Sequence, residues 1–240
     1  MGMPITVEVI DEVEPGVISE IFEYFIAVDN RYSTYKKDSE ISRINAGLPN
    51  SKFSAEMKKV LELCEQTKRD TNGFFDIVHN GKLDPSGLVK GWAIQNAAKQ
   101  LLGQGLHNFY IEAGGDIQVS GKNAQCLPWL TGIRNPFKPA EIIKVVAVTS
   151  EGVATSGTYI RGQHIYNPFE PTKPLQDVKS LTVIGPTIYE ADRFATAAFA
   201  MGRSGIDFIE SVAGLEAYMV DDRQRATYTS GFERYVVDND

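Results

Sequence analysis

The segment "NFYIEAGGDIQVSG", residues 108–121, restricts the possible folds of this chain more than any other. Two short runs with β-branched and aromatic residues flank a Gly-Gly pair, which is the pattern of two strands joined by a tight turn. Elsewhere, strand patterns and helix patterns follow one another in mixed order. The sequence therefore predicts an α+β fold with antiparallel sheet, rather than a doubly wound parallel sheet.

Hydrophobic periodicity and capping residues predict the remaining elements. Predicted helices cover 16–30, 40–45, 54–70, 88–102, 191–201 and 204–211. Predicted strands cover 4–10, 129–134, 142–149, 163–166, 180–184, "EAYMV" (216–220) and "RYVV" (234–237). No internal repeat or long linker divides the sequence, so residues 1–240 are expected to form a single domain with two closely packed sub-lobes.

Net charge narrows the range of partners. The 240 residues carry a formal charge of -7 at pH 7, whereas a general nucleic-acid surface needs clustered Lys and Arg. An anionic small molecule remains compatible with an acidic protein, because a bound metal ion supplies local positive charge. The sequence shows no signal peptide, no lipobox and no apolar stretch of about 18 residues, so we expect a cytoplasmic location without a membrane anchor.

The segment "YEADRFATAAFAMG", residues 189–202, places Asp192 and Thr196 in an Ala-rich apolar helix. The i, i+4 spacing brings the two side chains to one face of the helix, about one turn apart. A carboxylate and a hydroxyl are hard oxygen donors, which Mg²⁺ takes together with water and phosphate oxygens. Taken alone, the helix favours a structural interpretation, in which Asp192 caps the helix start and Thr196 bonds back to a carbonyl.

Glycine-containing turns lie beside polar residues at 83–93, 112–116, 154–159 and 162–168. Glycine lets a ligand approach the backbone, and a turn that feeds a helix presents amide groups to phosphate. Ordinary surface turns have the same composition.

Lys90, placed near the start of a predicted helix, opposes the helix dipole unless an anion lies nearby, and so points to a phosphate. The sequence contains neither GxGxxG nor a P-loop, so any nucleotide is held in another way.

Eight short motifs follow one another along nearly the whole chain. They are "MGMPITVEV", "YSTYKKDSEISRIN", "NGFFD", "LDPSGLVKGWA", "EAGGDI", "ATSGTY", "HIYNP" and "EADRFATAAFAMG". Each is weak alone, but in this order the set resembles the ApbE-like FAD:protein FMN transferase family. The resemblance implies a T-fold-like, ApbE-type arrangement: two sub-lobes of mainly antiparallel sheet with flanking helices, and an FAD cleft between them.

The same resemblance implies an activity and a set of site residues. The enzyme would use Mg²⁺ to cleave FAD, attach the FMN moiety by a phosphoester bond to a Thr or Ser hydroxyl of an acceptor flavoprotein, and release AMP. The Mg²⁺ ligands would be the Gly87 backbone carbonyl, the Asp192 carboxylate and the Thr196 hydroxyl. Asp192 and His164 would be the catalytic residues, with His164 activating the acceptor hydroxyl. FAD contacts would come from Met1, Tyr35, Phe74, Phe75, Asp76, Asp84, Lys90, Gly114, Gly115, Thr155, Ser156, Gly157 and Ile165.

Three departures from the family pattern bear on this activity. The loop over 77–83 is short where many relatives carry an additional β-rich segment, Gln95 stands where Asp is common, and "HIYNPFEPTKP" lacks the usual Thr-Gly. Two alternatives therefore stay open. One is an FAD pyrophosphatase that yields FMN and AMP, and the other is a non-catalytic FAD-binding module.

Overall fold

The computed structural model describes residues 2–157 and 165–237. In these residues seven strands form one sheet, in the order β1-β4-β5-β8-β9-β10-β11, and each strand is antiparallel to its neighbours. The strands are β1 (Ile5–Val9), β4 (Phe109–Ala113), β5 (Asp116–Ser120), β8 (Gly152–Gly157), β9 (Val178–Gly185), β10 (Glu216–Asp221) and β11 (Ala226–Tyr228). Two separate hairpins are β2 (Val78–His79) with β3 (Lys82–Leu83), and β6 (Trp129–Asn135) with β7 (Lys138–Val148).

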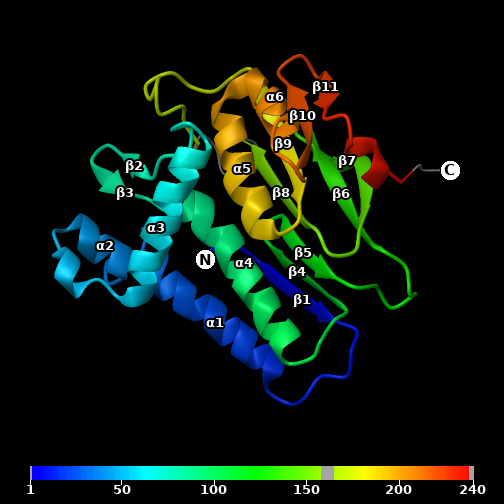
Figure 1. Ribbon diagram of the computed structural model, residues 1–240, viewed down its shortest axis with the longest axis horizontal. Coiled ribbons are helices and arrows are strands. Elements are labelled where there is room, and N and C mark those ends of the chain that lie inside the picture. The colour runs from blue at the N-terminus through cyan, green and yellow to red at the C-terminus, as the bar shows by residue number, and fades with distance from the viewer. Residues whose placement is uncertain (1, 158–164, 238–240) are drawn as a thin grey trace.

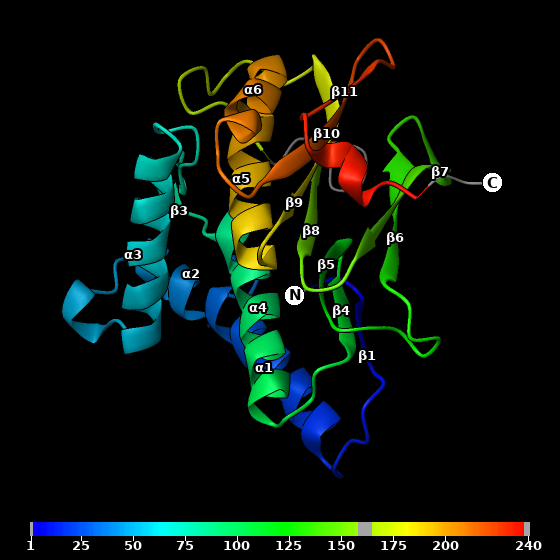
Figure 2. The same cartoon turned by 45° about the vertical axis from the view of Figure 1, so that its right-hand side comes forward.

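Helices cover one face of the sheet and the β6–β7 hairpin covers the other, as Figures 1 and 2 show. Successive residues of a strand point to opposite faces, so Ala154 of β8 joins the helical core while Val153 joins the core under the hairpin. The helices are α1 (Val17–Tyr32), α2 (Glu40–Asn45), α3 (Ala55–Asp70), α4 (Ser86–Gly103), α5 (Ile188–Ala200) and α6 (Gly205–Glu210). Short 3₁₀ turns are η1 (Asn50–Lys52), η2 (Gly202–Ser204) and η3 (Phe232–Tyr235).

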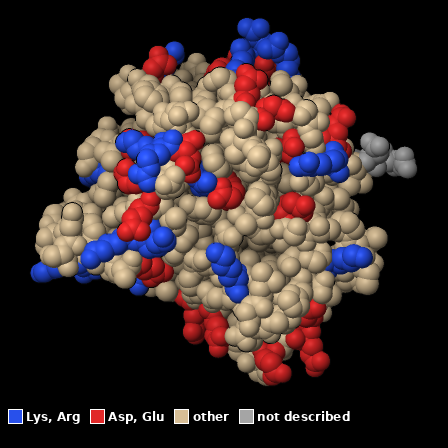
Figure 3. All heavy atoms as spheres, in the orientation of Figure 1, with Lys and Arg blue, Asp and Glu red and all other residues tan. Residues whose placement is uncertain are grey.

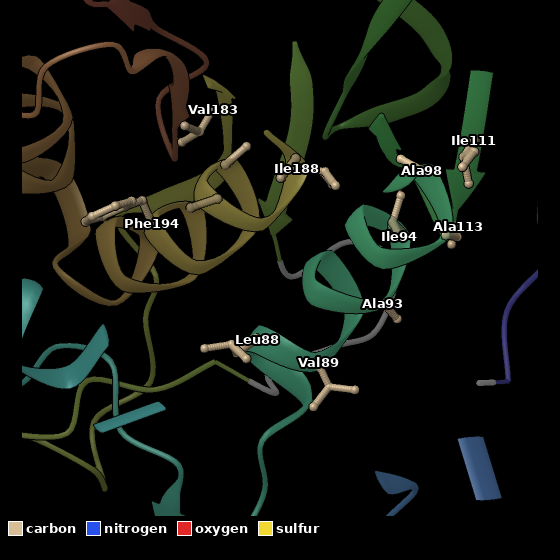
Figure 4. Close-up of a cluster of buried hydrophobic side chains, with 14 of the residues drawn as sticks. Leu88, Val89, Ala93, Ile94, Ala98, Ile111, Ala113, Val183, Ile188 and Phe194 are labelled. Carbon is tan, nitrogen blue, oxygen red and sulfur yellow. The ribbon is translucent and has the colours of Figure 1, made fainter. Parts of the chain in front are cut away.

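Two Ala-rich helices, α4 and α5, lie directly on the sheet. Leu88, Ala93 and Ile94 of α4 are fully buried, and they pack among side chains of β4, β9 and α5 (Figure 4). Small residues on both helices let the backbones approach closely, which brings polar groups near the start of α4 against α5. The position of the candidate site follows from this crossing.

The predicted α+β fold with antiparallel sheet is confirmed. Helix α3 begins after the predicted cap Ser54, whose hydroxyl accepts the Met57 N–H at 3.1 Å. The hairpin predicted around Gly114 and Gly115 joins β4 to β5. Among the described residues no helix is long and apolar enough to cross a membrane.

Strand β8 was not predicted, because "ATSGTY" has the composition of a turn. The strand begins two residues before this segment, at Gly152, where the neighbouring helix explains the glycine. A side chain at Gly152 would place Cβ 2.0 Å from the Ile188 backbone nitrogen at the start of α5, so only glycine fits. The short strands β2, β3 and β11 were also missed by periodicity, which needs longer runs.

Two predicted strands are wrong or incomplete. In the segment "RYVV" (234–237), Arg234 and Tyr235 form the end of η3, and a single bridge joins Val236 to Val146. The buried ring of Phe232 anchors this turn under the sheet, which favours a compact turn over an extended strand. Of the strand predicted at 163–166, residues 163–164 lie outside the described residues and 165–166 are not in a strand.

Replacing Gly152 by Ala tests the close approach of β8 and α5. The added methyl group would force α5 away from the sheet, and overpacking of this kind costs about 1–3 kcal/mol of unfolding free energy. Gly103→Ala is the matched control, since a Cβ there meets no atom within 4 Å and Ala favours a helix by up to about 1 kcal/mol. Denaturant unfolding should show Gly152→Ala destabilised and Gly103→Ala at least as stable as the parent. Equal stability of both variants would contradict the packing described.

Candidate functional site

A cavity of about 150 Å³ lies where the start of α4, the middle of α5 and the end of β8 come together. It brings together most of the residues predicted from the sequence. Those that line it are Phe74, Phe75, Asp76, Asp84, Gly87, Lys90, Gly114, Thr155, Ser156, Gly157, Ile165, Asp192 and Thr196. Ile77, His79, Ser86 and Tyr166 line it as well and were not predicted to belong to a site.

Four predicted residues are not placed in this cavity. Met1 and His164 lie outside the described residues. Gly115 is exposed at the β4–β5 turn, where its N–H donates to Glu112. Tyr35 is 97% exposed and lines a neighbouring cavity of about 610 Å³, which shares Asp84 and His79 with the first.

Asp192 does not cap helix α5, so the structural interpretation of this residue is wrong. The cap is Thr187, whose hydroxyl accepts the Glu190 N–H at 3.2 Å. Asp192 follows in the second turn, where its side chain is 4% exposed and faces α4. Its Oδ2 atom accepts the Gly91 N–H at 2.8 Å.

Thr196 bonds to the neighbouring helix and not to its own. Its hydroxyl donates to the Gly87 carbonyl oxygen at 3.3 Å. A Cβ at Gly87 would lie 3.1 Å from the Thr196 methyl group, and one at Gly91 would lie 2.7 Å from the Asp192 Cβ. Glycines at both positions therefore let α4 approach α5 closely enough to bring a carbonyl, a hydroxyl and a carboxylate together.

Lys90 is paired with carboxylates of the protein itself. Its ammonium nitrogen lies 2.6 Å from Asp116 Oδ2 and 3.8 Å from Asp192 Oδ1. These anions account for a cation near the start of α4, which the sequence had suggested as a sign of phosphate. Asp116, fully buried at the start of β5, was missed by the sequence prediction. The available signal was its position directly after the Gly-Gly pair.

Burial is the main electrostatic influence on Asp192. Burial, because a carboxylate without water around it is costly, is the main cause that raises the pKa of Asp192 to about 8, and the nearby Asp116 contributes in the same direction. Lys90 and the Gly91 N–H act in the opposite direction. A cation beside this carboxylate would favour its ionised form.

Tyr166 and His79 shape the wall on the other side of the cavity. The Tyr166 hydroxyl donates to the Asp76 and Val78 carbonyl oxygens at 3.1 and 3.0 Å, and its ring centre lies 4.2 Å from that of His79. The Asp76 carboxylate is paired with Lys68 at 2.7 Å. These contacts tie the segment after residue 164 to the short 77–83 loop.

The family model described as "ApbE family" matches residues 1–81 and 77–219. This chain belongs to the ApbE family. Its relatives include the FAD:protein FMN transferase of Vibrio cholerae, 23% identical over 92% of this chain and 84% of the relative. The FAD:protein FMN transferase of Haemophilus influenzae is 24% identical over 80% of this chain and 75% of the relative.

Solved structures of the ApbE family share the fold. The flavin transferase ApbE from Vibrio cholerae superposes with a TM-score of 0.85 at 22% identity, over 98% of this chain and 96% of that one. The ApbE protein from Thermotoga maritima gives a TM-score of 0.83 at 21% identity over the same shares of the two chains. The short 77–83 loop and the local departures in sequence therefore leave the fold of the family intact.

Replacing Asp192 by Asn tests the electrostatic description of the site without any ligand. The folded protein holds a proton on Asp192 up to about pH 8, whereas the unfolded chain loses it near pH 3.8. Stability in EDTA should therefore fall as pH rises toward 8 and level off above it, by up to about 1.4 kcal/mol per pH unit from this group. Asp192→Asn, which keeps an oxygen for the Gly91 N–H, should flatten the dependence between about pH 6 and pH 8. Parallel curves for variant and parent would refute this description.

Proposed function

We propose that this chain is a Mg²⁺-dependent FAD:protein FMN transferase. It would cleave FAD, attach the FMN moiety to a Thr or Ser hydroxyl of an acceptor flavoprotein, and release AMP. The observation that carries the proposal is the convergence of the Gly87 carbonyl, the Thr196 hydroxyl and the Asp192 carboxylate beside Lys90, in a cavity of an ApbE-family chain. In this proposal FAD lies in that cavity, in the cleft between two sub-lobes.

The donor set fits magnesium better than a softer metal. Carboxylate, hydroxyl and carbonyl oxygens are hard ligands, and Mg²⁺ commonly keeps water and substrate phosphates for the rest of its shell. Among the described residues no group of three His, Cys, Asp or Glu side chains is arranged to hold a metal by itself. A divalent cation beside the buried Asp192 would favour the ionised carboxylate and neutralise its charge.

Phosphoryl transfer needs neutralised phosphate charge, in-line placement and a proton acceptor. The new bond joins the acceptor oxygen to the FMN phosphorus, while the bond from that phosphorus to the AMP oxygen breaks. When bound, Mg²⁺ would neutralise charge on the phosphates. Lys90 would hold a phosphate from the side of the cavity, and the glycine turns around Gly114 and Gly157 would let FAD approach the backbone.

The proton of the acceptor hydroxyl needs a base, and the family resemblance assigns this role to His164. His164 lies outside the described residues, but Ile165 and Tyr166, which follow it in the chain, line the cavity. A neutral imidazole with an ordinary pKa near 6.5 is suited to accept a proton at neutral pH.

Acidic and basic side chains are interspersed over the face drawn in Figure 3, so Lys90 and the metal are the proposed attraction for the FAD phosphates.

Transfer assays with Asp192→Asn and Thr196→Val test this proposal. The substrate is FAD with Mg²⁺, and the acceptors are a panel of flavoprotein domains that carry a Thr or Ser. We expect Asp192→Asn to lower FMN transfer by about 100-fold or more, since a metal contributes several kcal/mol to such a step. Thr196→Val should raise the Mg²⁺ concentration that half-maximal transfer requires. Mass spectrometry of the acceptor and flavin fluorescence of the denatured product give the readout.

Thr131→Val is the matched control for Thr196→Val, because Thr131 is buried in β6 on the other side of the sheet. It should leave transfer unchanged. AMP release that needs no acceptor would favour an FAD pyrophosphatase. Stoichiometric FAD binding with no AMP, insensitive to Asp192→Asn, would favour a non-catalytic module and overturn the proposal.

A further inference from the structure

Asp116 is a buried carboxylate beside the cavity that the proposed reaction does not use. The residue is 0% exposed and begins β5. Its Oδ1 atom accepts the Thr155 N–H at 3.2 Å, and its Oδ2 atom lies 2.6 Å from the Lys90 ammonium. A buried charge is costly unless it is paired and hydrogen-bonded. Asp116 is therefore held by the backbone of β8 and by Lys90, and its side chain also lies within hydrogen-bond reach of the Asp192 carboxyl group.

Lys90 lies between two carboxylates but is not shared equally. Its nitrogen is in contact with Asp116 at 2.6 Å and stands 3.8 Å from Asp192 Oδ1. The other oxygen of Asp192, Oδ2, is taken up by the Gly91 N–H. Oδ1 is thus the Asp192 oxygen that faces Lys90 and that a metal would need.

We propose that Asp116 is a positioning residue that holds Lys90 away from Asp192 and so keeps Asp192 Oδ1 available to Mg²⁺. The inference rests on the proposed function. A lysine side chain has a flexible four-carbon stem and a compact charge, so its position follows the nearest anion. Without the charge of Asp116, Asp192 becomes the anion within reach, and a direct Lys90–Asp192 ion pair competes with the metal for the same oxygen.

The charges of the three groups agree with this role. With both carboxylates ionised, as a bound cation would favour, the two carboxylates and one ammonium sum to -1, and Mg²⁺ changes that to +1, which suits the diphosphate of FAD. The same sum suggests a rival explanation, in which Asp116 attracts Mg²⁺ only through its negative charge. The two explanations differ in one respect, because only the positioning role requires Lys90 to be present.

The test is a double-mutant cycle on Mg²⁺ affinity, measured by isothermal titration calorimetry on the FAD-free protein and again with FAD bound. Asp116→Asn should weaken Mg²⁺ binding by about 10-fold or more, the range seen when groups that orient metal ligands are removed. In the Lys90→Met background the same substitution should cost less than about 3-fold, since no ammonium is left to collapse onto Asp192. An equal loss in both backgrounds, or no loss from Asp116→Asn alone, would overturn the positioning role.

Controls separate folding and the proposed function from this inference. Asp221→Asn removes another buried aspartate, paired with Arg225 at 2.8 Å in β10, and should leave Mg²⁺ affinity unchanged. If Asp116→Asn does not fold, Asp116→Glu replaces it, because it keeps the charge but moves the carboxylate: weaker Mg²⁺ binding would support the positioning role, and unchanged binding would overturn it in favour of charge alone. A parent protein that binds no Mg²⁺ in either state would instead refute the proposed function itself.

Discussion

The close crossing of helices α4 and α5 is the contact on which the site depends. Gly87 and Gly91 remove the side chains that would separate the two backbones, and the Gly91 N–H then reaches the Asp192 carboxylate at 2.8 Å. That hydrogen bond and Lys90 offset part of the cost of burying this carboxylate. The candidate metal ligands are consequently placed by helix packing, on rigid elements, and not by mobile loops.

A small set of buried charges gives an acidic protein a means to hold an anionic dinucleotide. The chain has a net charge of -7, yet the cavity contains a lysine and a carboxylate suited to a divalent cation. Local charge within a few ångströms outweighs the distant surface, because salt screens exposed charges beyond about 8–10 Å. The membership of the ApbE family and the geometry of the site thus support the same proposal.

Local pattern predicted the elements and their type well, and family motifs brought most of the cavity residues together. Prediction from local pattern failed at positions whose conformation depends on residues distant in the sequence. At the start of strand β8, for example, Gly152 is required by its contact with Ile188 at the start of α5, which is distant in the sequence. The sequence analysis placed Asp192 at the helix cap. The capping pattern is instead carried by "TIYE" (187–190), in which Thr187 is the cap.

Asp116 shows the same limit for the site. Its partners are Lys90 and Thr155, which lie on two other elements, so spacing along the chain could not reveal the ion pair. The Gly-Gly turn before it drew attention to the backbone, while the buried charge follows directly after the turn. Several glycines in this protein lie where two structural elements approach closely, and a polar residue next to a glycine can belong to the functional site.

A crystal structure with FAD and Mn²⁺ in place of Mg²⁺, with anomalous scattering used to locate the metal, would show whether the crossing of α4 and α5 forms the metal site. We expect an anomalous peak within bonding distance of the Gly87 carbonyl, the Thr196 hydroxyl and Asp192 Oδ1, next to the FAD diphosphate, with Lys90 still paired with Asp116. FAD bound with the metal elsewhere, or with Lys90 paired directly to Asp192, would contradict it.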